Sequence, residues 1–335
     1  MDERTGLLIQ VLDALSRGKF EVSEKCGRTS CFDIFARREV LLLLIKILAN
    51  IDSMSEFRAR EMMCIAKMLS ASPIVVGSRT RSSNMEEGMV YKRYGVPAVT
   101  PETFEDVLLN EIFPIMLSAR GGYYVRIDGA ILRELRKAKN LSLGDVAENI
   151  GVSRRTVYKY EQESAGATFE TALRLEEFLD ESIVKPIEIF TIPKKLYRVA
   201  EVGDELEKKV LERLVHIGFQ VYPTKKAPFS ALTKSEKEVM LTKVVKFGLR
   251  KVLERARILK SISETVMAGA FFITDSSRDL RENIGGIPVI NKEELENIDK
   301  SGELVDTLIE RTAQGSVLLQ AGKPRHSYQK SSILF

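Results

Sequence analysis

The spacing of hydrophobic residues changes twice along the chain, and these changes divide it into three parts. Over about residues 1–119 and 188–320, helical repeats of apolar residues alternate with short apolar runs typical of strands. Over about 120–187 the apolar residues follow helical spacing. The pattern therefore predicts a multidomain protein of α and α/β type, with a central all-α domain flanked by two α/β domains. A loose, aperiodic tail is expected at 321–335.

The two outer parts repeat one order of predicted elements. A helix over 6–16 leads to a glycine and a Phe-x-Val strand, and a helix over 205–216 leads to the same pattern. More strands and a polar helix follow in each part, and each part closes on a strand that runs into a capped helix, at Thr100 or Asn291. Identity between the parts is low, but order and spacing recur, so we predict that 188–320 duplicates 1–119.

The central part contains two short helices with clear start and stop signals. Ser142 is placed to cap the first helix, and Asp145 follows three residues later to complete a capping box. Gly151 comes where a tight turn needs a positive φ. Ser153 then caps the second helix, predicted over 153–161. Two helices joined by so short a turn indicate a helix-turn-helix.

The second helix of this pair has one apolar side and one side rich in hydrogen-bond donors. Val157 and Tyr160 are expected to face inward. Arginines on the other side can donate two hydrogen bonds to a guanine or grip a phosphate, and hydroxyl groups can reach phosphate oxygens. We therefore expect this helix to enter the major groove of double-stranded DNA. The predicted DNA-contacting residues are Ser142, Ser153, Arg154, Arg155, Thr156, Tyr158 and Lys159.

Charge within the central part agrees with a polyanionic partner. The whole chain carries a formal net charge of only +4. Residues 120–159 hold nine basic and four acidic residues, whereas residues 160–185 hold two basic and seven acidic ones. A basic block followed by an acidic one indicates that one element faces a polyanion and the next is turned away from it.

These motifs resemble the lambda-repressor-like (Cro/XRE) helix-turn-helix family. The stretch 132–142 is similar to that family's first helix and entry loop, and the spacing of Ala147, Gly151, Val157 and Glu161 fits its second and third helices. The resemblance covers about residues 127–180 and implies DNA binding. One departure is Leu143, since the family often has at this position a glutamine that contacts a backbone phosphate.

The three-part order, with a Cro/XRE module between two larger α/β parts, also resembles an archaeal family, the "Putative HTH-type transcriptional regulatory protein" family. This second resemblance implies transcriptional control, without indicating a ligand or a target.

The outer parts resemble degenerate forms of the restriction-endonuclease-like fold. In that fold an aspartate and a following Glu-x-Lys hold a divalent metal ion. Asp33 and Lys46 fall at the expected places, but Leu44 stands where the second carboxylate belongs. In the second copy Ser230 replaces the aspartate, and the strand around 242–246 has no carboxylate. We therefore expect no catalytic residues, no metal site and no cofactor.

The remaining candidate chemistry is sparse. Three cysteines exclude a disulfide scaffold, suit a reducing cytoplasm and have no spacing typical of a metal cluster. The loop 77–82, with Arg79 and Arg81, is either a solvated basic loop or an anion site. No apolar run is long enough to span a membrane, and the N-terminus has no secretory signal pattern.

The sequence as a whole favours a cytoplasmic, sequence-specific DNA-binding transcriptional regulator that reads the major groove with the helix 153–161. A homodimer is expected, because two half-sites add their binding free energies. The alternative is a nuclease-related DNA-processing enzyme that uses the helix-turn-helix to find its substrate. A third possibility is an adaptor that applies the same motif to a protein.

Overall fold

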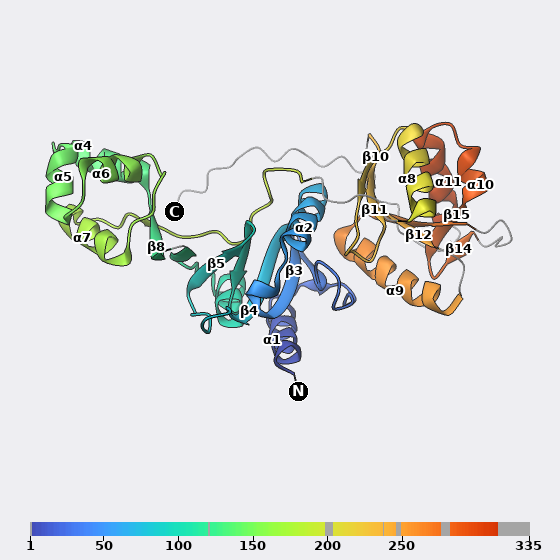
Figure 1. The fold of residues 1–335 in the computed structure, drawn as a ribbon, viewed down its shortest axis with the longest axis horizontal. Coiled ribbons are helices and arrows are strands. Elements are labelled where there is room, and N and C mark those ends of the chain that lie inside the picture. The colour runs from blue at the N-terminus through green and yellow to red at the C-terminus, as the bar shows by residue number, and fades with distance from the viewer. Residues whose placement is uncertain are drawn as a thin grey trace. The chain divides into compact units, whose positions relative to one another are not determined.

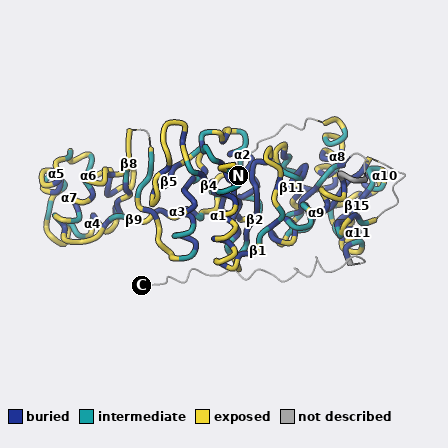
Figure 2. Tube along the Cα trace, turned by 90° about the horizontal axis from the view of Figure 1, so that it is seen from below, coloured by how far each residue is buried: buried dark blue, intermediate teal, exposed yellow. Residues whose placement is uncertain are grey.

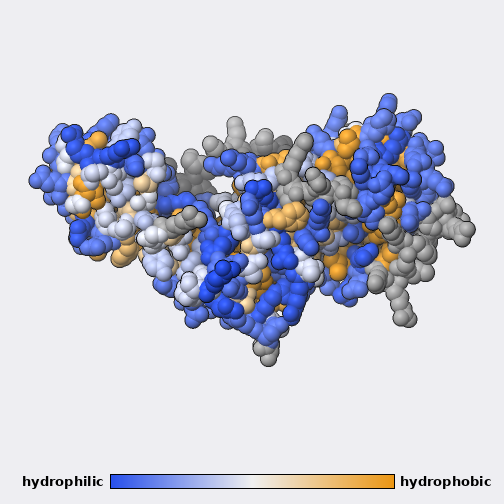
Figure 3. All heavy atoms as spheres, in the orientation of Figure 1, coloured by the Kyte–Doolittle hydropathy of each residue, from blue (hydrophilic) through white to orange (hydrophobic). Residues whose placement is uncertain are grey.

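The computed structural model describes residues 2–119, 121–197, 204–236, 238–245, 249–275 and 282–313, so the tail predicted at 321–335 lies outside the described residues. The chain forms two compact units: Met1–Val22 with Cys26–Val199, and Ser23–Lys25 with Ala200–Phe335 (Figure 1). Hydrophilic residues cover most of the face shown in Figure 3, and hydrophobic ones form small patches between them. Among the described residues, no helix is long and apolar enough to cross a membrane.

The first unit begins with an α/β domain whose sheet carries helices on both faces. Its core cluster joins Val11 and Leu15 of the first helix to Ile45 and Ile74 of the central strands. Because side chains alternate along a strand, Leu44 points to the opposite face, where the second helix packs. The elements are α1 (Glu3–Arg17), β1 (Glu21–Val22), β2 (Ile34–Arg38), β3 (Leu41–Asn50), η1 (Ile51–Ser53), α2 (Glu56–Leu69), β4 (Ser72–Arg79), β5 (Met89–Arg93), β6 (Val96–Val99), α3 (Pro101–Glu105) and the π-helical turn η2 (Asp106–Asn110).

The second unit repeats the order of α-helices and β-strands from α1 to α3, and one additional helix follows; the turns η1 and η2 have no counterpart among its described residues. A single core cluster again joins the first helix to the strands, through Val210, Leu214, Phe271 and Ile290. The elements are α8 (Glu205–His216), β10 (Gln220–Pro223), β11 (Ala231–Lys234), β12 (Val239–Val245), α9 (Leu249–Val266), β13 (Gly269–Thr274), β14 (Asn283–Ile284), β15 (Ile287–Asn291), α10 (Lys292–Glu296) and α11 (Ser301–Ala313).

The two sheets have one topology. The strand order is β1-β2-β3-β4-β6-β5 in the first unit, before the sheet continues into the central region, and β10-β11-β12-β13-β15-β14 in the second. In both sheets the third strand pairs in parallel with the fourth, and the fourth with the sixth. Figure 2 shows buried residues concentrated in these strands and on the inner sides of the helices.

Backbone details also coincide between the two sheets. The last hairpin turns through two positive-φ residues in each, Tyr94-Gly95 and Gly285-Gly286. The long helix ends on a residue with a φ of 54° at Ser70 and 55° at Met267. The predicted caps Thr100 and Asn291 are present, since each side chain accepts a hydrogen bond from the first turn of its helix.

The central region is built from four helices and a small extension of the first sheet. The prediction of an all-α central domain is wrong in this respect, because β8 and β9 lie within 120–187. Residues 122–127 alternate, with Val125 and Ile127 buried, so the local period is that of a strand. β7 pairs with β5 as well as with β8, which continues the sheet of the outer domain into the central region. The elements are β7 (Met116–Ala119), β8 (Gly122–Ile127), α4 (Gly129–Ala138), α5 (Leu143–Ile150), α6 (Arg154–Glu161), α7 (Phe169–Leu179) and β9 (Val184–Lys185).

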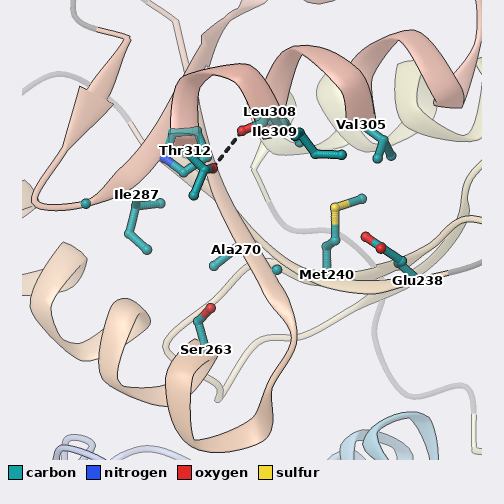
Figure 4. Close-up of a pocket in the computed structure, with 12 residues that line it drawn as sticks. Glu238, Met240, Ser263, Ala270, Ile287, Val305, Leu308, Ile309 and Thr312 are labelled. Carbon is teal, nitrogen blue, oxygen red and sulfur yellow. Dashed lines mark hydrogen bonds between the residues drawn. The ribbon is translucent and has the colours of Figure 1, made fainter. Parts of the chain in front are cut away.

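A cavity in the second unit is too small to hold an organic effector. Its volume is about 20 Å³, which is room for about one water molecule. The close-up in Figure 4 shows Met240 of β12, Glu238 just before that strand, Ser263 of α9, and Thr312 at the end of α11. The Thr312 hydroxyl, one of the polar groups that line this cavity, donates to the Leu308 carbonyl oxygen at 2.6 Å and is therefore satisfied within its own helix.

Candidate nucleic-acid interface

The helix pair α5–α6 forms as its start and stop signals predict. Ser142 Oγ accepts hydrogen bonds from the backbone N–H groups of Gly144 and Asp145, and the Asp145 carboxylate accepts from the Ser142 N–H at 2.6 Å. This reciprocal pair is the predicted capping box. Gly151 ends α5 with a φ of 72°, and Ser153 Oγ accepts from the Thr156 N–H at 3.1 Å at the start of α6.

A small hydrophobic core fixes the angle between these helices. Val146 and Ile150 of α5 pack with Val157 and Tyr160 of α6, and all four are buried. The close contact between Gly129 and the end of α6 is not evident from the sequence. A Cβ atom at Gly129 would lie 2.5 Å from the Glu161 carbonyl oxygen, so a glycine is required where α4 begins against the end of α6.

The predicted DNA-contacting side chains lie together along α6 and at the start of α5. Ser142, Ser153 and the four long side chains are exposed, and Thr156 is half-buried. Arg154, Arg155 and Lys159 form no ion pair within the described part of the chain. Their charges are therefore available to an external anion. The four long side chains are Arg154, Arg155, Tyr158 and Lys159.

Two arginines of α4 have a structural role. Arg136 Nε donates to the buried Glu161 carboxylate at 2.5 Å, and Arg136 Nη1 donates to the Leu141 carbonyl oxygen. Arg133 donates to the carbonyl and carboxylate oxygens of the same glutamate. The hydrogen bond that Arg136 donates to Glu161 raises the pKa of Arg136. Both arginines belong to the basic block 120–159, but their ion pairs with Glu161 mean that they are not free cations.

Leu143 stands where the resemblance implies a glutamine, and the cationic side chain of Arg154 lies next to the following residue. A Cβ atom on the next residue, Gly144, would lie 3.6 Å from Arg154 Nε. The Arg154 side chain thus lies over the first turn of α5. The hydrogen bonds with Ser142 lower the pKa of Asp145 most, and the charge of Arg154 lowers it further. A guanidinium at this helix N-terminus is well placed to contact a backbone phosphate.

The carboxylate–lysine pair of the first outer domain is buried and fully used inside the protein. Asp33 Oδ1 accepts from Arg4 Nη2 at 2.5 Å and from Lys46 Nζ at 3.4 Å, and Asp33 Oδ2 accepts from the Ile47 N–H at 2.7 Å. Lys46 also donates to the Ser30 carbonyl oxygen at 2.8 Å. Burial lowers the pKa of Lys46, and Asp33 opposes that shift.

These residues do not fit a divalent metal ion. Leu44 replaces the second carboxylate, and two cations rather than a metal neutralise Asp33. Within the described ranges, no three His, Cys, Asp or Glu side chains are grouped as metal ligands. All three cysteines are free and buried, and burial raises the pKa of Cys26 to about 12.

The second outer domain keeps the lysine of this centre, which the sequence comparison missed. The Ser230 N–H donates to the Thr242 carbonyl oxygen, and Ser230 Oγ accepts from the Val244 N–H at 3.2 Å. Asp33 makes the same two contacts, to Ile45 and Ile47. Lys243, between Thr242 and Val244, is therefore the counterpart of Lys46. The sequence analysis examined residues 242–246 for a carboxylate and did not match Lys243 to Lys46.

The basic loop 77–82 has partners inside the protein. Arg79 lies 3.7 Å from the Glu3 carboxylate, and the Arg81 N–H donates to the Asp52 carboxylate at 2.6 Å. A Cβ atom at Gly77 would lie 2.5 Å from Ile51, so the loop starts in a crowded place. The solvated-loop interpretation therefore fits better than the anion site.

The capped helix pair, its core and its exposed cations define a helix-turn-helix protein of the transcriptional-regulator class. Residues 132–185 match a family described as helix-turn-helix, and residues 4–114 match the PD-(D/E)XK superfamily domain. The first of these matches agrees with the predicted Cro/XRE module, and the second with the nuclease-like fold expected for the first outer domain.

Relatives cover almost the whole chain. A protein of Methanothermobacter thermautotrophicus is 41% identical over 92% of this chain and 97% of its own length, and one of Methanocella arvoryzae is 39% identical over 92% and 97%. A protein of Archaeoglobus fulgidus is 36% identical over 92% and 98%. Each is named "Putative HTH-type transcriptional regulatory protein", and this chain belongs to that family, as its three-part order predicts.

One solved structure matches only part of the chain. It is the restriction-modification controller protein C.AhdI from Aeromonas hydrophila, 35% identical over 16% of this chain and 82% of that chain. The TM-score is 0.16, and no argument rests on it.

Proposed function

We propose that this protein is a sequence-specific DNA-binding transcriptional regulator that reads the major groove with the helix 153–161. The observation that supports this best is the set of exposed, unpaired cations on a helix held by caps and a buried core. Arg155 and Lys159 are the candidates for base edges, and Arg154 for a phosphate near the start of α5. Ser142, Ser153, Thr156 and Tyr158 complete the contact surface through hydroxyl groups.

We propose further that the outer domains do not cleave DNA. The support is Leu44 in the place of a metal-binding carboxylate, with Asp33 already neutralised by Arg4 and Lys46. Without a carboxylate pair, this position lacks the ligands with which this type of nuclease holds the metal ion that orients water.

The three domains of this proposal are 1–119, 120–187 and 188–320, and the third is a copy of the first. The support for duplication is the shared strand order and the shared helix-end and hairpin conformations. The protein is proposed to act as a homodimer, because a single helix-turn-helix module buries a modest area on DNA and two half-sites add their free energies.

The test is selection from random duplex DNA at two salt concentrations, with Mg²⁺ present and the DNA checked for cuts. We expect enrichment of an intact motif with two half-sites about one helical turn apart. Steeply salt-dependent binding without enrichment would refute sequence-specific reading. Cut strands would refute the non-catalytic role of the outer domains.

A further inference from the structure

The two copies of the nuclease-like fold differ in how the central lysine is neutralised. In the first domain Asp33 contacts both Lys46 and Arg4, and Lys46 is 1% exposed. In the second, Ser230 takes the aspartate's backbone contacts but carries no charge. Lys243 is only half-buried there, so solvent and solutes can reach it.

The positive residue next to the lysine is kept in both domains. Counting from the matching helix ends at Ser70 and Met267, the sequence Arg-Ala-Arg falls at 58–60 in α2 and at 255–257 in α9. Ala59 and Ala256 are both fully buried, which supports this alignment. Arg58 acts electrostatically on Lys46, and Arg255 acts in the same way on Lys243.

The carboxylates have been lost while the cations remain. Besides Asp33, the first domain buries Glu61 on α2, and its counterpart on α9 is Ile258. Burial lowers the pKa of Lys243, Arg255 lowers it further, and Glu207 of α8 opposes the shift. Yet among the residues that the structure describes, neither Glu207 nor any other carboxylate forms an ion pair with Lys243 or Arg255.

We propose that Lys243 and Arg255 form a metal-free site for a phosphate group in the second outer domain. Lys243 lies on β12 and the exposed Arg255 lies on α9, which packs against that strand, so the two side chains can both donate to one oxyanion. Partial burial strengthens such a contact relative to one in water, and a bound phosphate relieves the repulsion between the two cations. Ser230, in the place of Asp33, brings no negative charge that would repel the anion.

The phosphate can come from a DNA backbone or from free phosphate in solution. The choice of duplex DNA as the first probe rests on the proposed function. The evidence for the site is independent of that function. In the DNA case this site adds a sequence-independent contact to those of α6, and the salt dependence of binding reports it.

The test uses the full chain with two variants that change the site in different ways. Lys243→Gln removes the cation, and Ser230→Asp restores the carboxylate of the first domain while keeping an acceptor for the Val244 N–H. Lys300→Gln, an exposed lysine of the same unit, is the matched control. For each protein, the affinity for an unselected duplex is measured over a range of salt, and broadening of the ³¹P signal of inorganic phosphate is recorded.

If the ligand is DNA, both site variants should lower the slope of log K against log salt by about one, and the control should not. If the ligand is free phosphate, ³¹P broadening should disappear in both variants while the slope stays constant. Variants that match the control in both measurements would overturn the proposal. Should Ser230→Asp fail to fold, Lys243→Gln decides alone.

Failure of this site is distinguishable from failure of the helix 153–161. The double variant Arg154→Ala/Arg155→Ala should lose sequence preference and keep the response to Lys243→Gln. If it keeps its sequence preference instead, the helix proposal fails and the phosphate site is unaffected.

Discussion

Two groups of cations in the first unit have opposite surroundings. Lys46 and Arg4 are directed at Asp33 in the interior, where Lys46 is 1% exposed. Arg154 and Arg155 lie on the surface of α6 with no ion pair within the described residues. Both groups come from basic motifs typical of DNA-acting proteins, but only the second can meet an external anion. The difference teaches that pairing and burial, more than residue type, decide whether a cation affects folding or binding.

The largest effect expected from this comparison is on stability. Asp33→Ala leaves the buried Lys46 and the partly buried Arg4 without their carboxylate, and it removes the acceptor of the Ile47 N–H. We expect a loss of roughly 3–5 kcal/mol in the free energy of unfolding, measured by urea denaturation. The affinity for DNA should stay unchanged at temperatures where the variant is folded.

The second outer domain supplies the control for this prediction. Ser230→Ala removes the same backbone contact, to the Val244 N–H, but leaves no buried charge unpaired. It should cost only about 1 kcal/mol. Equal losses in the two variants would show that the backbone contact, rather than the charge pair, stabilises this position.

The next largest effect is on DNA affinity and concerns the exposed arginines of α6. Arg155→Ala should reduce the affinity for the selected DNA site by roughly 1–3 kcal/mol if the side chain reads a base. Arg154→Ala should weaken all sequences alike and lower the salt slope by about one, as expected of a phosphate contact. The free energy of unfolding should change by no more than about 0.5 kcal/mol in either variant.

Lys300→Ala, in the second unit, controls for a change of net charge alone. Fluorescence anisotropy with the selected site and with a scrambled duplex gives both readouts. If neither arginine variant differs from this control, α6 is not the reading element.

A smaller effect follows from the thiols beside the buried pair. Burial chiefly, with a contribution from Asp33, raises the pKa of Cys26 to about 12, from 9.0 in the unfolded chain. The folded state therefore keeps a proton that the unfolded chain releases. The resulting stability is complete below pH 9 and falls by about 1.4 kcal/mol per pH unit as the pH rises towards 12.

The measurement is the unfolding free energy of the wild type and of Cys26→Ala between pH 8 and pH 10. The variant should lose stability less steeply. The lowered pKa of Lys46 has the opposite effect on stability, because with rising pH the folded state releases this proton before the unfolded chain does. Lys46 is present in both proteins, so its effect on the two curves is the same. Parallel curves would show that Cys26 is hydrated in the folded state.

Local signals in the sequence were sufficient for the helix-turn-helix. The serine caps, the capping box and the positive-φ glycine each depend on a few adjacent residues, so α5 and α6 could be placed from the sequence with their buried sides. The order of elements in the outer domains was predictable for the same reason, since each helix and strand has its own period.

Contacts between residues distant in sequence were not predictable. Glu161 pairs with Arg133 and Arg136, which lie 28 and 25 residues away in the sequence, and no local pattern marks that pairing. β8 looked like part of a helical domain because its strand partners, β7 before the central region and β9 near its end, are separated from it by a boundary or by about 60 residues. Lys243 escaped notice because strand register, rather than residue similarity, aligns it with Lys46.

The smallest expected effect concerns one residue, Ser153, that influences both stability and DNA binding. Ser153 caps α6 and precedes Arg154 and Arg155, so Ser153→Ala should cost about 1 kcal/mol of stability and loosen the turn that carries both arginines. We expect DNA affinity to fall by up to about fivefold, the equivalent of 1 kcal/mol.

Thr168→Ala is the control, because it removes the corresponding cap of α7. The Thr168 side chain accepts a hydrogen bond from the Thr171 N–H at 3.2 Å. It should cost similar stability and leave DNA affinity unchanged, because α7 follows the reading helix on the acidic side of the domain. If both variants weaken DNA binding equally, the cap acts through the stability of the domain, and the arginines do not depend on a pre-formed first turn of α6.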